Sequence, residues 1–312
     1  MKIAVMGTGG VGGYFGGLLA RGGHEVTFVA RGPHLRAIQE RGLRVESAND
    51  GHFTVQGQAV EDTSQAGIQD LVLFTVKMYS NADAIKAVAP LLGPDTIILT
   101  LQNGIDNGDQ LVAAFGPERV MIGSTYLEGR IREPGVVTQG GPGAAAFGER
   151  EPGITPRGEK LLALFQEAGW KVQLAQNMPD MLWKKFGYLA ATAALCTACN
   201  ATIGEIRTTP ETRALLQAAV VEAMTVGLAL GAPIQDDTVE WSMRALDNFP
   251  AGGQSSMAKD FKEGKPVELE GLTGTVIRLG RQAGVPTPIS DTFYAILKPW
   301  ALRLQSQSQN QV

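Results

Sequence analysis

The chain has 312 residues, which is long for a single hydrophobic core, so one large or two medium domains are expected. Hydrophobic residues make up 44% and charged residues 19%, as in ordinary globular proteins, and 39 glycines favour many turns and close backbone approaches. A net charge of −4 without a long run of Lys or Arg argues against a nucleic-acid partner.

We find no targeting or membrane signal in the sequence. The start, MKIAVMGTGG, runs directly into an apolar strand, and no apolar stretch has the length of a membrane-spanning helix. Cys196 and Cys199 form a CxxC spacing inside an Ala-rich apolar helix, a setting that disfavours a redox or metal role. We therefore expect a cytoplasmic protein with no metal site and no membrane partner.

Residues 2–31 have the pattern of a βαβ unit. The apolar strand 2–7 leads into a helix with apolar residues at helical spacing, and residues 24–31 return to a strand. The loop between strand and helix is in GxGxxG register, where glycines allow a tight turn and close approach of pyrophosphate to backbone N–H groups. The pattern predicts a dinucleotide-binding loop made of Gly7, Thr8, Gly9, Gly10, Val11 and Gly12.

The end of the second strand favours NADP(H) over NAD(H). An NAD site usually has Asp or Glu there to bind the ribose 2′-hydroxyl, but this sequence reads VARGPHLR and has no carboxylate until Glu40. Arg31 occupies the place, and its guanidinium suits a 2′-phosphate. The alternative, a solvated surface arginine, would not explain the missing acid.

Alternating strands and helices continue to about residue 177. We predict strands and a closing hairpin at 70–77, 96–104, 119–129, 132–149 and 170–176, with crossover helices at 82–92 and 108–116. Lys77 and Asn103 each end a strand, at the edge where open α/β sheets bind ligands. Both are candidate cofactor-binding residues, and Asn103 is also a candidate substrate ligand. A simple turn-forming role is the alternative for each.

After residue 178 the sequence predicts helices, at about 180–199, 209–231, 238–246, 267–284 and 288–304. The predicted fold is therefore α/β. A Rossmann-type, doubly wound parallel sheet in residues 1–177 binds NADP, and an all-α substrate and catalytic domain follows in 178–312. The apolar helical domain could also support a homodimer.

Motifs along essentially the whole chain resemble those of the ketopantoate reductase (2-dehydropantoate 2-reductase) family. Six motifs follow one another in the family's order: GTGGVG at 7–12, VK at 76–77, QNG at 102–104, LWKK at 182–185, SSMAKD at 255–260 and VELEGLTG at 267–274. The resemblance implies that Lys185 is the catalytic lysine, Ser256 the substrate-binding serine of the second domain and Glu268 the active-site glutamate. Glu270 stands where the family usually has Asp. The implied reaction is NADPH-dependent reduction of ketopantoate to (R)-pantoate, in pantothenate and coenzyme A biosynthesis.

The chemistry of this reaction explains the lysine. Hydride delivery to a 2-oxo acid leaves an alkoxide, which needs a proton and a nearby positive charge. Lys185 can supply both, and Glu268 could orient the lysine or accept a substrate hydroxyl. Adjacent residues on a helix point about 100° apart, so we expect Lys184 to face solvent.

The polar substrate wall of the family is missing beside the lysine. Where the family has asparagines at i+4 and i+8 from the lysine, this chain has Leu189 and Ala193, and Ile203 replaces a third asparagine. A pocket without those amides cannot select strongly for hydroxyl groups. We hypothesise that Leu189 and Ala193 line the site of a less hydroxylated 2-oxo acid, or of ketopantoate bound with altered affinity. Asn200 or Ser255 could compensate.

Two other functions stay open. The first is a related D-2-hydroxy acid dehydrogenase that acts on a more apolar 2-oxo acid. The second is a non-catalytic NADP-binding sensor, which would have no need of Lys185 or Glu268. In the two enzymatic cases, the expected partner is a small-molecule 2-oxo acid.

Overall fold

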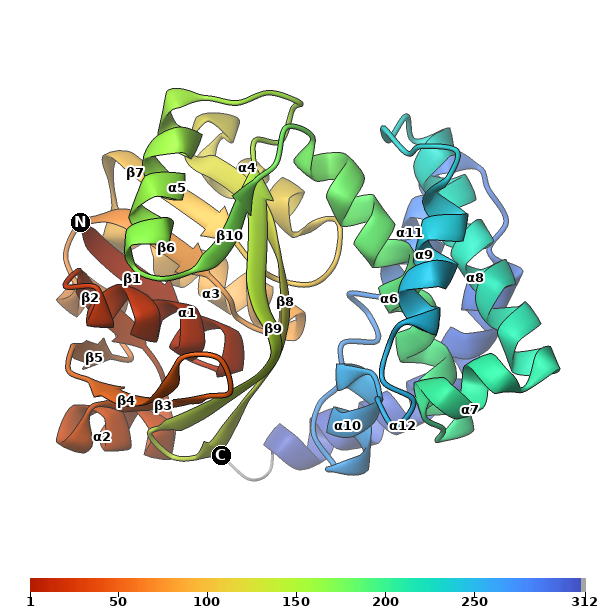
Figure 1. The fold of residues 1–312 in the computed structure, drawn as a ribbon, viewed down its shortest axis with the longest axis horizontal. Coiled ribbons are helices and arrows are strands. Elements are labelled where there is room, and N and C mark those ends of the chain that lie inside the picture. The colour runs from red at the N-terminus through yellow and green to blue at the C-terminus, as the bar shows by residue number, and fades with distance from the viewer. Residues whose placement is uncertain (310–312) are drawn as a thin grey trace. The chain divides into compact units, whose positions relative to one another are not determined.

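The structure is a computed structural model that describes residues 1–309, and Figure 1 shows its fold. The chain divides into two units, Met1–Met178 and the residues from Pro179 onward. The first unit alternates strands and helices, and the second contains only helices among its described residues. The predicted fold class is therefore confirmed.

The first unit is built on one sheet, with the strands β1 (Lys2–Met6), β2 (Glu25–Val29), β3 (Leu43–Ser47), β4 (Gly51–Val55), β5 (Gln58–Val60), β6 (Gln69–Phe74), β7 (Leu92–Thr100), β8 (Val120–Glu133), β9 (Val136–Gly148) and β10 (Lys171–Leu174). Their order is β4-β3-β9-β8-β7-β6-β1-β2-β5, with β10 paired to β9. The pairs β8–β9 and β3–β4 are antiparallel and the others are parallel.

Helices cover both faces of this sheet. They are α1 (Gly10–Arg21), α2 (Gly32–Arg41), α3 (Asn81–Val88), α4 (Asn107–Phe115) and α5 (Pro156–Glu167), with short 3₁₀ turns η1 (Thr63–Gln65), η2 (Met78–Ser80), η3 (Ala89–Leu91) and η4 (Pro117–Arg119). Side chains alternate between faces along β1: Ile3 and Val5 join a core cluster with α1 and α5, whereas Ala4 and Met6 join one with α3 and α4.

The strand order creates a switch point beside β1. The chain leaves β1 through α1 and returns as β2 on one side, while β6 pairs with the other side of β1. Open α/β sheets bind ligands outside the carboxyl ends of the strands at such a point. The glycine loop follows β1 directly, so the fold puts the predicted dinucleotide loop at this edge.

The second unit consists of helices α6 to α12. Their bounds are α6 (Met178–Cys199), α7 (Ile203–Thr208), α8 (Pro210–Ala229), α9 (Thr238–Asp247), α10 (Ser256–Lys262), α11 (Thr273–Ala283) and α12 (Pro288–Gln309). Glycines let α6 and α8 pack closely. A Cβ at Gly187 would lie 2.4 Å from Cε of Met224, and one at Gly227 would lie 2.8 Å from the Trp183 ring.

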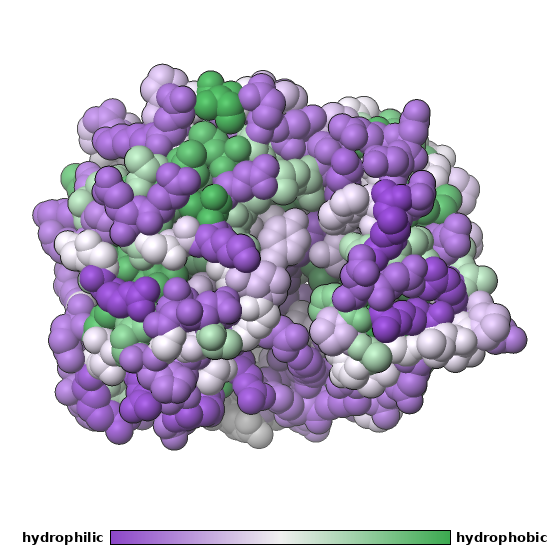
Figure 2. All heavy atoms as spheres, in the orientation of Figure 1, coloured by the Kyte–Doolittle hydropathy of each residue, from purple (hydrophilic) through white to green (hydrophobic). Residues whose placement is uncertain are grey.

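The sequence analysis expected no apolar stretch with the length of a membrane-spanning helix, and the structure contains one. By length and composition alone, α8 is long and apolar enough to cross a bilayer. However, α8 packs against α7, α9, α11 and α12, and its buried Glu222 accepts hydrogen bonds from the backbone N–H groups of Ile289 (2.9 Å) and Ser290 (2.8 Å) in α12. Through these contacts α8 packs one face into its unit. Hydrophilic residues cover most of the face shown in Figure 2.

Several elements differ from the prediction. The segments α2, β3, β4, β5, α5, α7 and α10 were not predicted. The helix expected at 267–284 begins only at Thr273, because turns occupy the residues before it, where Leu272 N–H donates to the carbonyl of Glu268 at 3.1 Å.

Candidate active site

The glycine loop has the shape that a dinucleotide requires. A Cβ at Gly10 would lie 2.1 Å from the carbonyl carbon of Gly129 on β8, and one at Gly12 would lie 2.4 Å from the carbonyl oxygen of Gly7. In contrast, a Cβ at Gly9 would have no neighbour within 4 Å among the described residues. The first turn of α1 has no acidic residue and no side-chain cap, which leaves its backbone N–H groups available to an anion. The loop therefore fits a pyrophosphate.

The rest of the loop is tied to the end of β2, where Arg31 follows. The backbone N–H and the hydroxyl of Thr8 both donate to the carbonyl of Val29, at 3.0 and 3.1 Å. Arg31 lies two residues further on, is exposed, and occupies the N-cap position of α2 without a side-chain capping bond. Val11 packs against the core below the loop, so its backbone is the part that can face a ligand.

A network of side-chain amides that the sequence analysis missed fixes the next two strand ends. The buried Gln102 donates through Nε2 to the carbonyl of Val76, the residue before Lys77, and to Oδ1 of Asn81, both at 2.7 Å. Asn81 donates to Asn107 at 2.8 Å, and Asn107 donates to the carbonyl of Asn103 at 2.6 Å. Lys77 is exposed and Asn103 is half-buried. The network holds the backbone of both candidate ligands in place.

Lys185 is a buried lysine on α6. Lys185 is only 8% exposed, and burial lowers the pKa of its side chain to about 8. Burial disfavours the charged form because the surrounding protein solvates an ammonium less well than water does. A lysine with such a pKa can release a proton near neutral pH, which an ordinary surface lysine does poorly.

The predicted solvent-facing role of Lys184 was wrong. Its side chain is only 16% exposed and forms an ion pair with Asp180, one turn earlier on α6, at 3.1 Å. Its Nζ also donates to Oε1 of Gln235 at 3.4 Å. The acid at i−4, which the sequence displays, gives Lys184 a partner within its own unit. The two lysines still differ in burial, because Lys184 is partly exposed whereas Lys185 is buried.

The helix face that carries Lys185 is apolar further along. On this face Leu189 is half-buried and Ala193 is buried. Ile203, the third position where the family motifs imply an asparagine, is buried at the start of α7. The candidate compensating residues have structural roles. Asn200 is exposed and ends α6 with a positive φ of 52°, and Ser255 caps α10 by accepting from Ala258 N–H at 3.1 Å.

The remaining candidate residues lie on α10 and before α11. Ser256 is the first residue of α10 and is exposed. Glu268 is buried, whereas Glu270 is exposed. Glu270 accepts a hydrogen bond from the Tyr294 hydroxyl at 2.8 Å and forms an ion pair with Lys298. Glu270 therefore connects its segment to α12, and Glu268 is the carboxylate of this pair that is enclosed.

The two cysteines of the CxxC pair have different surroundings. Cys196 is fully buried and Cys199 is exposed, and both are free thiols. Burial raises the pKa of the Cys196 thiol to about 11, although a hydrogen bond from the backbone of Ser255 acts in the opposite direction. A reactive cysteine needs a lowered pKa, so the surroundings of Cys196 disfavour a redox role for this thiol.

Two family models match the chain. The model described as ketopantoate reductase PanE/ApbA matches residues 3–152, and the model of its C-terminal domain matches residues 177–301. Together they cover both units.

Individual proteins match over nearly their full length. The chain is 29% identical over 299 residues to YkpB, an uncharacterized oxidoreductase of Bacillus subtilis, covering 96% of this chain and 98% of that protein. It is also 29% identical to 2-dehydropantoate 2-reductase of Mesorhizobium japonicum, covering 97% and 98%. A solved PanE/ApbA family ketopantoate reductase from Ralstonia eutropha JMP134 has a TM-score of 0.90 at 32% identity, covering 98% of this chain and 100% of that one.

Proposed function

Because this chain belongs to the ketopantoate reductase family and is an oxidoreductase, we propose that it reduces a 2-oxo acid with NADPH, with ketopantoate as the leading substrate. The product would be the corresponding 2-hydroxy acid, (R)-pantoate in the case of ketopantoate, on the route to pantothenate and coenzyme A. The observation that carries the proposal is the buried Lys185, whose pKa of about 8 suits a proton donor.

The first unit would hold the cofactor. The glycine loop from Gly7 to Gly12 offers backbone N–H groups to the pyrophosphate, and the exposed Arg31 offers a guanidinium to the 2′-phosphate of NADPH. Lys77 and Asn103, whose loops the amide network fixes, would bind the ribose or the substrate oxygens. When bound, the nicotinamide dinucleotide supplies the hydride.

The second unit would supply the proton. Lys185 donates a proton to the developing alkoxide and offsets its negative charge until the proton has moved. Glu268 accepts a hydrogen bond from the lysine or from a substrate hydroxyl. Ser256, exposed at the start of α10, binds the substrate through its hydroxyl. Both cysteines are free thiols, which suits the reducing cytoplasm where we propose the enzyme acts.

An apolar 2-oxo acid is the second candidate substrate. Leu189 and Ala193 replace amides on the lysine's face, and Asn200 and Ser255 are engaged in capping their helices. A pocket that lacks amide partners loses the means to reject substrates without hydroxyl groups. The enzyme would then act as a D-2-hydroxy acid dehydrogenase.

One experiment separates these functions. NADPH consumption is measured with ketopantoate and with 2-oxoisovalerate, which lacks the hydroxyl. No turnover with either substrate, despite NADPH binding, would leave the sensor function. Turnover with ketopantoate alone would exclude the apolar-substrate candidate, and faster turnover of 2-oxoisovalerate would support it.

The two adjacent lysines give a matched pair for the catalytic role. Lys185→Ala should reduce turnover by orders of magnitude, because the transition state loses its proton donor. Lys184→Ala should remove the ion pair with Asp180 and the hydrogen bond to Gln235, and change turnover little. Equal losses in turnover would contradict the assignment of Lys185.

A further inference from the structure

The loop that leads to Ser256 has a backbone that could adopt many conformations. We call residues 248–255 the serine loop; it joins α9 to α10 and ends in Ser255, the N-cap of α10. It includes Gly252 and Gly253, and glycines lose the most conformational entropy when ordered. Contacts from outside the loop must therefore hold it in one place.

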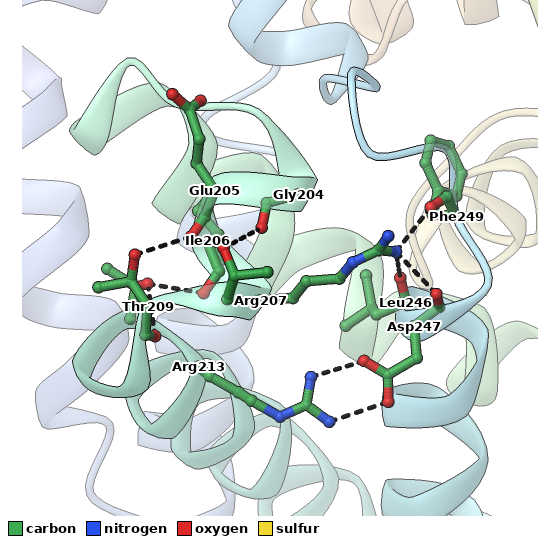
Figure 3. A network of polar contacts seen from close by, with 11 residues as sticks. Gly204, Glu205, Ile206, Arg207, Thr209, Arg213, Leu246, Asp247 and Phe249 are labelled. Atoms are coloured by element: carbon green, nitrogen blue, oxygen red, sulfur yellow. Dashed lines mark hydrogen bonds and ion pairs between the residues drawn. The ribbon is translucent and has the colours of Figure 1, made fainter.

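Arg207 on α7 provides the first contact (Figure 3). Its Nη1 donates to the backbone carbonyls of Leu246 (3.1 Å), Asp247 (2.7 Å) and Phe249 (2.7 Å). These carbonyls lie at the end of α9, where helix geometry leaves carbonyl groups without partners and where a cation is favoured. Arg207 thus determines the direction in which the serine loop leaves α9.

The start of α7 provides the second contact. The backbone N–H groups of Ile203 and Gly204 donate to the carbonyls of Gly253 and Ala251, both at 2.8 Å. A Cβ at Gly204 would lie 2.6 Å from the Ala251 carbonyl oxygen, so the two segments touch backbone to backbone. Since Arg207 also lies on α7, one short helix holds the serine loop at two places.

The far end of the serine loop touches α6. The backbone of Ser255 forms a hydrogen bond to the buried Cys196 thiol. Cys196 comes 11 residues after Lys185, about three helical turns, so it lies on the same face of α6 roughly 16 Å along the axis. The serine loop is therefore held against the helix face that carries the proposed proton donor.

We propose that Arg207 is a positioning residue for substrate binding, which acts by fixing the serine loop and, through it, Ser256. This inference rests on the proposed function, because the substrate role of Ser256 belongs to that proposal. A guanidinium placed among three carbonyls fixes direction as well as charge. Loss of Arg207 should weaken binding of the 2-oxo acid and leave the hydride and proton steps unchanged.

Arg213 provides a matched control. It forms a bidentate pair with the same Asp247, at 2.6 and 2.9 Å, but through the carboxylate and from a position where both side chains are about two-fifths exposed (39% and 43%). Figure 3 shows the two arginines side by side around Asp247. Arg213→Met thus removes a surface ion pair without removing the bonds to the loop carbonyls.

The test uses Arg207→Met, Arg207→Lys and Arg213→Met in a Cys199→Ser background, where Cys196 is the remaining thiol. We expect Arg207→Met to raise KM for the 2-oxo acid on the order of tenfold, with kcat and KM for NADPH within about twofold. The rate at which a thiol reagent modifies Cys196 should rise by a similar factor, because the loop covers it less of the time. Arg207→Lys should be intermediate, and Arg213→Met should match the parent.

Two results would overturn the inference. One is an Arg207→Met protein with the parent's KM and the parent's Cys196 modification rate. The other is an Arg213→Met protein with the same changes as Arg207→Met, which would indicate general loosening of the unit. If the parent does not turn over any 2-oxo acid, the proposed function fails. The Cys196 rate still decides whether Arg207 holds the loop, and an unchanged rate would reject it.

Discussion

Replacing Lys185 with methionine should remove a pH-dependent contribution to stability between about pH 8 and 10.5. Burial lowers the pKa of Lys185 from 10.5 to about 8. A shift of this size corresponds to roughly 3 kcal/mol of unfavourable free energy for the buried ammonium. Methionine has a similar length and no charge, so the variant loses both this titration and the proposed proton donor.

The sign of the pH dependence follows from proton binding. Between about pH 8 and 10.5 the unfolded chain keeps a proton on this lysine that the folded protein has released. The free energy of unfolding of the wild type therefore rises with pH across this window. Below it both states are protonated and the full cost remains. The stability of Lys185→Met relative to the wild type should thus fall by roughly 3 kcal/mol from neutral pH to the top of the window.

The assay is urea unfolding of both proteins, followed by tryptophan fluorescence at a series of pH values. Taking the difference between the two proteins at each pH cancels the titration of groups that they share. A difference in unfolding free energy that stays constant across the window would refute the lowered pKa. A variant with full turnover would refute the catalytic role of Lys185 as well.

Three further predictions concern Lys185, Arg31 and the glycine loop. The value of kcat/KM for reduction should fall above pH about 8, as Lys185 loses its proton, and a rate that is flat to pH 10 would contradict this. Arg31→Ala should raise KM for NADPH about tenfold or more and change KM for NADH little, and equal changes would exclude contact with the 2′-phosphate. Gly9→Ala should keep the parent's melting temperature, because its Cβ would meet no other described residue, but it should lose NADPH affinity, because this open space is where the pyrophosphate is proposed to bind. Gly10→Ala should lower the melting temperature, because its Cβ would meet the backbone of β8. Thermal melting and NADPH titration measure the pair, and equal melting temperatures would contradict the packing of Gly10.

The sequence predicts best what depends on neighbours in the chain. The glycine loop, the strand before it and the helix after it are encoded by local spacing, and β1 and α1 appear where the pattern indicates. The same holds for α6, α8 and α9, whose apolar stripes are long. Lys185 and Glu268, the two catalytic candidates that the family motifs single out, are both buried, and their roles stay predictions.

Elements and contacts that depend on tertiary structure were missed. The strand β3 alternates correctly, with Leu43 and Val45 buried and Arg44 exposed, but five residues are too few to stand out beside glycine-rich turns. Gln102 acts on a backbone 26 residues away, and Arg207 on carbonyls 39 to 42 residues away. No spacing in the chain signals such contacts, because they exist only after the elements have packed.

The contact between Gly10 and Gly129 constrains how this sequence can change. Each glycine lacks a side chain, and a Cβ at either one would meet the other's backbone, at 2.1 Å from Gly10 and 2.8 Å from Gly129. A substitution at one position therefore cannot be rescued by a smaller residue at the other. A chimera of related chains joined between these two positions should keep this contact only when the parent of its first segment has glycine at position 10 and the parent of its second segment has glycine at position 129.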